Sequence, residues 1–229
     1  MTRPLWCVVP AAGRGTRVGG NCPKQYLPLA GRPLIMQTLA RLAAHPQVAG
    51  LLVVLAADDR RWPGIDTLAG KPVHTTAGGG ERADSVLAGL RALPAEVAAG
   101  DFVLVHDAAR PCVREADIDR LIATASAEGG LLGAPLRDTL KRADEHGRSA
   151  LTEPREQRWR AFTPQMFRRG QIAAALEAAG REGVLVSDEA MAMEQAGFAP
   201  LLVEGAEDNI KVTTMADFAL AEFLLSRTK

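Results

Sequence analysis

The chain reads LWCVVPAAGRGTR over residues 5–17. Its first half is a short aliphatic run, which is typical of a strand covered on both faces in a mostly parallel sheet. Its second half places small and basic residues at the carboxyl end of that strand, where backbone amides can approach a phosphate group. The stretch therefore predicts an α/β protein that binds a phosphate after its first strand.

Short aliphatic runs and helical patterns alternate along most of the remaining chain. Further strands are expected at residues 51–56 and 102–105, and helices at residues 33–44, 82–93, 115–127 and 214–229. Pro33 suits the first position of its helix. The alternation predicts a doubly wound, mostly parallel, Rossmann-like sheet in a single domain covering residues 1–229. Because ligands bind beyond the carboxyl ends of such strands, candidate sites follow Val9, Val105 and the segment at residues 73–76.

Residues 137–160 break this pattern, because charged residues dominate and apolar residues are few. Two short segments, 138–142 and 149–153, flank the turn-like sequence DEHG, which predicts a projecting hairpin. An isolated hairpin is only marginally stable in water, so we expect this β-arm to pack on a second copy of the chain and to serve in dimerisation. The alternative is a surface loop without fixed structure.

Composition excludes several classes of protein. The 27 basic and 27 acidic residues cancel, so no positive field attracts polymeric nucleic acid, and none is expected as a partner. No apolar run approaches the ~20 residues that span a bilayer, and the first apolar run is too short for a secretory signal. The three cysteines form no pattern typical of disulfides or zinc. We therefore expect a cytoplasmic protein with reduced thiols and no membrane partner.

The glycine-rich turn comes close to two nucleotide-binding motifs without matching either. The third glycine of the G-x-G-x-x-G pattern is missing, which leaves a dinucleotide-dependent oxidoreductase as a weak alternative, and no G-K-[ST] follows for a P-loop. The sequence PKQYL at residues 23–27 delivers Lys24 shortly after the turn. We expect Arg17 and Lys24 to flank one polyphosphate.

Four motifs, in order along nearly the whole chain, make the sequence recognisable. They are PAAGRGTR with CPKQYL, then GGGERADSV, HDAARP and DNIKVT, and they begin at residues 10, 22, 78, 106 and 208. The set resembles the 2-C-methyl-D-erythritol 4-phosphate cytidylyltransferase family. The resemblance implies a nucleotidyltransferase sheet and transfer of the cytidylyl group of CTP to 2-C-methyl-D-erythritol 4-phosphate, with release of pyrophosphate. It also implies a Mg²⁺ cofactor, a homodimer with exchanged β-arms and a place in non-mevalonate isoprenoid precursor biosynthesis.

The same resemblance assigns roles to individual residues. Catalytic roles fall on the cations Arg17, Lys24 and Lys211, the last of which is expected near the end of a short strand. Contacts to the nucleotide fall on Pro10, Ala11, Ala12, Gly13, Gly15, Gly79, Gly80, Ser85 and Ala108. Contacts to the acceptor fall on Asp107, Arg110, Thr139, Arg155, Thr163 and Ser187, and Asp107 also holds the metal. Some relatives carry aspartate at the position of Gly80, so only a backbone contact is expected there.

Two alternatives concern the acceptor and the class of protein. Ribitol-5-phosphate cytidylyltransferases share most of these motifs but more often carry valine at the second alanine of HDAARP, which favours methylerythritol phosphate here. A non-catalytic nucleotide-binding module would need a degenerate phosphate site, whereas Arg17, Lys24, Asp107 and Lys211 are all present. No catalytic base is expected among the four histidines, because a phosphate monoester with a second pKa of ~6 is already largely dianionic near neutral pH.

Overall fold

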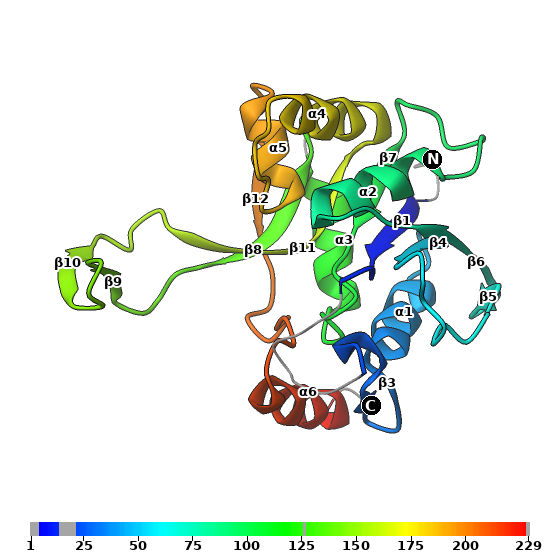
Figure 1. The fold of residues 1–229 in the computed structure, drawn as a ribbon, viewed down its shortest axis with the longest axis horizontal. Coiled ribbons are helices and arrows are strands. Elements are labelled where there is room, and N and C mark those ends of the chain that lie inside the picture. Colours follow the sequence, from blue (N-terminus) through cyan, green and yellow to red (C-terminus); the bar gives the residue numbers. More distant parts are fainter. Residues whose placement is uncertain (1–4, 14–21, 126, 228–229) are drawn as a thin grey trace.

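The computed structural model describes residues 5–13, 22–125 and 127–227 (Figure 1). Its centre is an eight-stranded sheet with the spatial order β12 (Leu201–Glu204), β8 (Gly130–Pro135), β11 (Trp159–Arg168), β7 (Phe102–Val105), β1 (Leu5–Pro10), β4 (Val48–Leu55), β6 (Lys71–Ala77) and β5 (Thr67–Leu68). The helices are α1 (Leu34–Ala44), α2 (Arg82–Arg91), α3 (Glu115–Thr124), α4 (Arg169–Arg181), α5 (Glu189–Gln195) and α6 (Met215–Arg227). The remaining elements are the 3₁₀ turn η2 (Lys24–Tyr26) and the short strands β2 (Pro28–Leu29), β3 (Arg32–Pro33), β9 (Leu140–Ala143) and β10 (Ser149–Glu153).

Most neighbouring strands of the large sheet run parallel. β1 pairs in parallel with both β4 and β7, β4 pairs with β6, and β8 pairs with β12. β11 and β5 run in the opposite direction to their neighbours. The carboxyl ends of β1, β6 and β7 consequently meet at one edge of the sheet.

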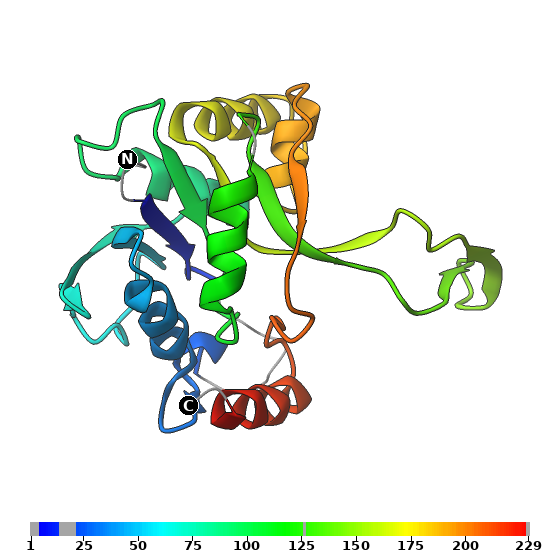
Figure 2. The same cartoon turned by 180° about the vertical axis from the view of Figure 1, so that it is seen from behind.

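Helices cover both faces of the sheet, as predicted for a doubly wound fold. α1 and α3 pack on one face, and α2, α4 and α5 pack on the other; Figure 2 shows α1 and α3 from their own side. The side chains of β1 alternate between the two layers, since Cys7 and Val9 join the first and Trp6 and Val8 join the second. This explains why the first strand is apolar at every position.

A smaller apolar cluster forms around α6. Phe218 of this helix packs with Leu29 from the β2–β3 hairpin and with Val212 from the segment before the helix. The cluster therefore places the segment that carries Lys211 beside the turn that carries Lys24. Within the described ranges, no helix has both the length and the apolar character that crossing a bilayer requires.

The β-arm predicted at residues 137–160 is present as a hairpin. β9 and β10 pair antiparallel, and Asp144 closes the turn by accepting hydrogen bonds from the backbone amides of His146 and Arg148. Gly147 adopts a φ of 74°, which a residue with a side chain rarely does. The arm continues β8 and β11 and projects well away from the body of the molecule (Figure 1). The hairpin is confirmed, and its role between two chains stays a prediction.

Several predicted boundaries were wrong. Pro33 precedes α1 as its N-cap rather than opening the helix, because it already pairs within the β2–β3 hairpin. Lys211 lies in an irregular segment and not near the end of a strand, because the cluster around α6 holds this stretch. The helices predicted at residues 82–93 and 115–127 end at Arg91 and Thr124. The patterns also fail to predict β8, β11, β12, α4 and α5.

Two helical glycines provide a matched test of the packing. A Cβ at Gly89 of α2 would lie 2.5 Å from Val8 Cγ1 and 2.8 Å from Val54 Cγ2, whereas a Cβ at Gly180 of α4 would meet nothing within 4 Å. We expect Gly89→Ala to lower the free energy of unfolding by about 1–3 kcal/mol through overpacking. Gly180→Ala should leave it unchanged or raise it by up to ~1 kcal/mol. Urea denaturation measures both changes, and a Gly89→Ala variant as stable as the wild type would contradict this close contact of α2 with the sheet.

Candidate active site

A pocket of about 200 Å³ opens at the carboxyl edge of the sheet. Three turns, which follow β1, β6 and β7, meet there with the irregular segment before α6. The pocket is lined by Pro10, Ala11, Ala12, Gly13, Lys24, Gln25, Gly79, Gly80, Glu81, Arg82, Ser85, Asp107, Ala108, Ala109 and Lys211. This is the position at which doubly wound folds bind their ligands.

The structure brings most of the predicted site residues together. The predicted residues in the pocket are Pro10, Ala11, Ala12, Gly13, Lys24, Gly79, Gly80, Ser85, Asp107, Ala108 and Lys211. Gly15 and Arg17 lie outside the described residues.

Five predicted acceptor contacts do not line the pocket. Arg110 and Thr163 are buried behind Asp107. Ser187 is exposed before α5, where its hydroxyl lies 3.5 Å from the sulfur of Met191. Thr139 and Arg155 line a separate hollow on the β-arm.

Gln25 fixes the start of the glycine-rich turn. Its buried side-chain amide donates to the carbonyl oxygens of Ala11 at 2.9 Å and Gly13 at 3.2 Å. On the other side, the backbone amide of Ala11 donates to the carbonyl of Val54 in β4 at 2.8 Å. The first residues of the turn are therefore held at the pocket by contacts with two other parts of the chain.

Glycine lets the turn after β6 approach the start of α2. A Cβ at Gly79 would lie 2.3 Å from the Cβ of Asp84, so a larger residue would displace the helix start. Asp84 and Glu81 form a capping box there, each accepting from the other's backbone amide. A Cβ at Gly80 would meet nothing closer than 3.9 Å. That position has room for a side chain.

Asp107 lies between three cations. Its Oδ1 is 3.0 Å from Arg82 Nη2, and its Oδ2 is 3.0 Å from Lys211 Nζ and 3.3 Å from Arg110 Nε. Burial by itself would raise the pKa of this carboxyl, but Arg82, Lys211 and Arg110 together hold the pKa well below its usual range. Asp107 is therefore ionised at neutral pH.

The segment that carries Lys211 is fastened to the rest of the site. Lys24 Nζ donates to the carbonyl of Val212 at 2.6 Å, and Arg110 Nη1 donates to the carbonyl of Asn209 at 2.7 Å. The backbone amide of Val212 also donates to the carbonyl of Ala109 at 2.8 Å. These bonds bring two lysines that are far apart in sequence to one pocket.

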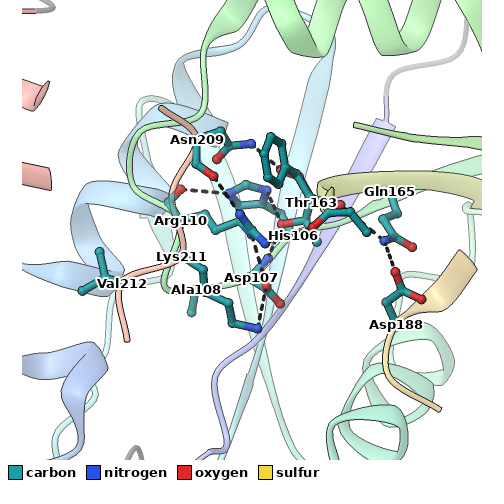
Figure 3. Close-up of polar contacts among 12 residues, drawn as sticks. His106, Asp107, Ala108, Arg110, Thr163, Gln165, Asp188, Asn209, Lys211 and Val212 are labelled. Atoms are coloured by element: carbon teal, nitrogen blue, oxygen red, sulfur yellow. Dashed lines mark hydrogen bonds and ion pairs between the residues drawn. The ribbon is translucent and has the colours of Figure 1, made fainter. Parts of the chain in front are cut away.

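A buried hydrogen-bond chain fixes the turn after β7 from behind (Figure 3). His106 Nε2 lies 3.0 Å from the carbonyl of Arg110, so this nitrogen carries the ring proton. Nδ1 then accepts from the Thr163 hydroxyl at 3.1 Å, and that hydroxyl accepts from the backbone amide of Asp107 at 3.0 Å. Burial lowers the pKa of His106 to about 4. The imidazole is therefore neutral at pH 7 and supports Asp107 rather than transferring protons.

The sequence patterns gave no role to four residues that line the pocket, which are Gln25, Glu81, Arg82 and Ala109. They also gave none to Glu189 and Asn209, which lie outside its lining. Gln25 and Asn209 stand inside recognised motifs, and their fixed spacing is the signal that could have found them. Asn209 is buried and donates to the carbonyl of Thr163 at 2.8 Å. Glu189 lies outside the four motifs, and nothing in a single sequence shows that it faces Arg82.

The donor set at the pocket is compatible with Mg²⁺. Among the residues that the structure describes, no three His, Cys, Asp or Glu side chains form a cluster suited to a metal. Mg²⁺, however, is often held by one or two carboxylates with phosphate oxygens and water as its other ligands. Asp107 is such a carboxylate, and the Lys211 side chain that shares its Oδ2 is 40% exposed, so it has room to move.

The chain resembles one protein family along nearly its whole length. The family described as IspD, 2-C-methyl-D-erythritol 4-phosphate cytidylyltransferase, matches residues 5–227. The chain belongs to this family. A 2-C-methyl-D-erythritol 4-phosphate cytidylyltransferase of Xanthomonas campestris pv. campestris (strain 8004) is 59% identical over 228 residues, which cover 99% of this chain and 86% of that protein.

Solved structures of the 2-C-methyl-D-erythritol 4-phosphate cytidylyltransferase family share the fold. A 4-diphosphocytidyl-2C-methyl-D-erythritol synthase superimposes with a TM-score of 0.85 at 34% identity, covering 98% of this chain and 100% of that chain. A 2-C-methyl-D-erythritol 4-phosphate cytidylyltransferase from Thermus thermophilus gives 0.77 at 31% identity, covering 99% and 100%. The predicted family and its α/β nucleotidyltransferase fold are confirmed, and the oxidoreductase alternative is wrong.

The neutral His106 predicts a pH-dependent stability. Its pKa is about 4 in the folded chain against 6.5 for an unperturbed histidine, so unfolding takes up a proton between these values. The stabilisation is complete above pH 6.5 and is lost as the pH falls toward 4. From pH 7 to pH 5, we expect the wild type to lose about 2 kcal/mol more unfolding free energy than His106→Asn. Urea denaturation at both pH values measures this, and equal losses in the two proteins would contradict a neutral buried imidazole.

Proposed function

We propose that this chain transfers the cytidylyl group of CTP to 2-C-methyl-D-erythritol 4-phosphate, giving 4-diphosphocytidyl-2-C-methyl-D-erythritol and pyrophosphate. One observation carries the proposal: Lys24, Asp107 and Lys211 line a single pocket between glycine-rich turns in a chain of this family. Two lysines suit a triphosphate, and turns of small residues let backbone groups approach a base and ribose beside it.

The chain's own residues account for most of the reaction. The acceptor's phosphate oxygen attacks the α-phosphorus in line, pyrophosphate leaves on the opposite side, and negative charge grows on the oxygens between. Lys24 and Lys211 line the pocket in which that charge would form. The resemblance to the family assigns the same role to Arg17, which lies outside the described residues. No side chain needs to remove a proton from the attacking group, because a phosphate monoester has a second pKa of ~6. A neutral, structurally engaged His106 agrees with this.

The proposed cofactor is Mg²⁺, which Asp107 would hold together with phosphate oxygens. The ion would supply positive charge to the triphosphate. Asp107 suits this role because its low pKa keeps the carboxylate ionised. If Lys211 turned to a phosphate oxygen, Oδ2 would keep only its contact with Arg110, and the carboxylate of Asp107 would have room for the ion.

We place the reaction in a homodimer, with the β-arm of one chain beside the pocket of the other. Two observations support this arrangement: Thr139 and Arg155 line the same hollow on the arm, and neither lines the pocket of its own chain. An arginine fork is well suited to a phosphate acceptor. A cytoplasmic location and a role in non-mevalonate isoprenoid precursor biosynthesis rest on the family and on the composition.

Pyrophosphate release tests the reaction. With CTP and Mg²⁺, we expect turnover with 2-C-methyl-D-erythritol 4-phosphate to exceed turnover with ribitol 5-phosphate by roughly tenfold or more, since the acceptors differ in chain length and in a methyl branch. A reaction without acceptor is the control. Faster turnover of ribitol 5-phosphate would reverse the choice of acceptor, and no pyrophosphate with either would refute the proposal.

Subunit mixing tests the exchanged arm. Lys24→Ala removes a pocket residue and Arg155→Ala removes an arm residue, so a heterodimer of the two contains one pocket with both intact. Random mixing of symmetric dimers should therefore restore about a quarter of wild-type activity. Each variant mixed with itself is the control. Absence of recovery in a sample shown by native mass spectrometry to contain heterodimers would contradict the sharing.

A further inference from the structure

Arg82 joins two carboxylates at the side of the pocket. Its Nη1 and Nη2 donate to Glu189 Oε1 at 2.5 Å and Oε2 at 3.1 Å, and its Nε donates to Asp107 Oδ1 at 3.1 Å. Each guanidinium nitrogen is thus engaged by a carboxylate. Paired contacts of this kind fix the direction of both partners as well as their distance.

Glu189 is itself firmly held. It is fully buried and is the first residue of α5. The start of that helix is tied to β11, because Gln165 accepts from the backbone amide of Ala190 at 2.8 Å and donates to Asp188 at 3.0 Å. Figure 3 shows the contact between Gln165 and Asp188. The sheet is therefore connected to Asp107 through the backbone at the start of α5, the side chain of Glu189 and the guanidinium of Arg82.

We propose that Glu189 is a positioning residue for cytidylyl transfer, which through Arg82 holds the carboxylate of Asp107 toward the pocket. The inference rests on the function proposed above. Glu189 does not line the pocket, so its effect on the reaction passes through Arg82.

The contacts of the two carboxylate oxygens of Asp107 explain how its orientation is kept when a ligand binds. Oδ1 is bound by Arg82, which is fixed at its far end by Glu189. Oδ2 is shared by buried Arg110 and the partly exposed Lys211. When Lys211 turns to a ligand phosphate, the contacts of Arg82 and Arg110 remain, and the orientation of the carboxylate is retained.

Charge explains why a second buried carboxylate is present. Three cations surround Asp107, and Glu189 balances one of them. Without Glu189, Arg82 would keep a single carboxylate partner and would no longer fix the direction of Asp107. Glu189→Gln removes the charge with little change of volume, so it loosens Arg82 without opening a cavity.

Steady-state kinetics well below the melting temperature separate positioning from simple stabilisation. We expect Glu189→Gln to lower kcat roughly tenfold with little change in the KM for CTP, because Lys24 and the glycine-rich turns are untouched. Glu177→Gln is the matched control, since it removes the carboxylate of an exposed ion pair, 2.8 Å long, between Arg91 of α2 and α4. This control should keep the wild-type kcat.

A double-mutant cycle tests whether Glu189 acts through Arg82. Arg82→Met should also lower kcat, and it should lower the melting temperature because it leaves a buried carboxylate without its partner. Adding Glu189→Gln to Arg82→Met should lower kcat no further and should raise the melting temperature above that of Arg82→Met alone. Losses of kcat that multiply would show independent action and overturn the proposal.

Measuring the wild type in parallel distinguishes a failure of the positioning role of Glu189 from a failure of the proposed function. If the wild type turns over and Glu189→Gln has the same kcat, even with a lower melting temperature, the positioning role is wrong and the proposed function stands. No turnover by the wild type would refute the proposed function and this inference together.

Discussion

Three cationic side chains, Arg82, Arg110 and Lys211, share one small volume because the carboxylate of Asp107 lies between them. Cations that contact the same carboxylate lie close enough to repel one another strongly where water is excluded. Their arrangement therefore depends on the buried negative charge of Asp107. The same contacts join the start of α2, the turn after β7 and the segment before α6. The ion cluster therefore organises the backbone of the site as well as its charge.

The sheet makes this convergence possible. β1 and β7 are parallel neighbours, so the turns after them meet at one edge, and the turn after β6 lies two strands further along. Apolar layers on both faces keep these strands in register and leave only their ends to carry polar chemistry. Lys211 is held at the same edge by a different interaction, which is the packing of α6 with Leu29 and Val212.

The β-arm is connected to the pocket through its base. Arg137 and Arg160, where the arm leaves the body, both pair with Glu207, and the distance from Arg137 Nε to Glu207 Oε1 is 2.6 Å. Glu207 stands in the irregular segment that continues to Lys211. The base of the arm therefore contacts the same segment of the chain that carries Lys211. Ion pairs on an exposed surface add little stability by themselves.

Four features could be predicted from the residues alone: the α/β class, the place of the pocket after the first strand, the hairpin of the arm and the family. Those features follow from local patterns, such as the apolar run before Pro10 or the turn at Asp144, and from motifs with fixed spacing. The pairing of Glu189 with Arg82, the irregular course of the chain at Lys211 and the enclosed position of Thr163 were decided only by the tertiary structure. Each of these features depends on a charged or polar group finding a partner from a distant part of the sequence. Such a partner is needed because the folded chain excludes the water that would otherwise serve.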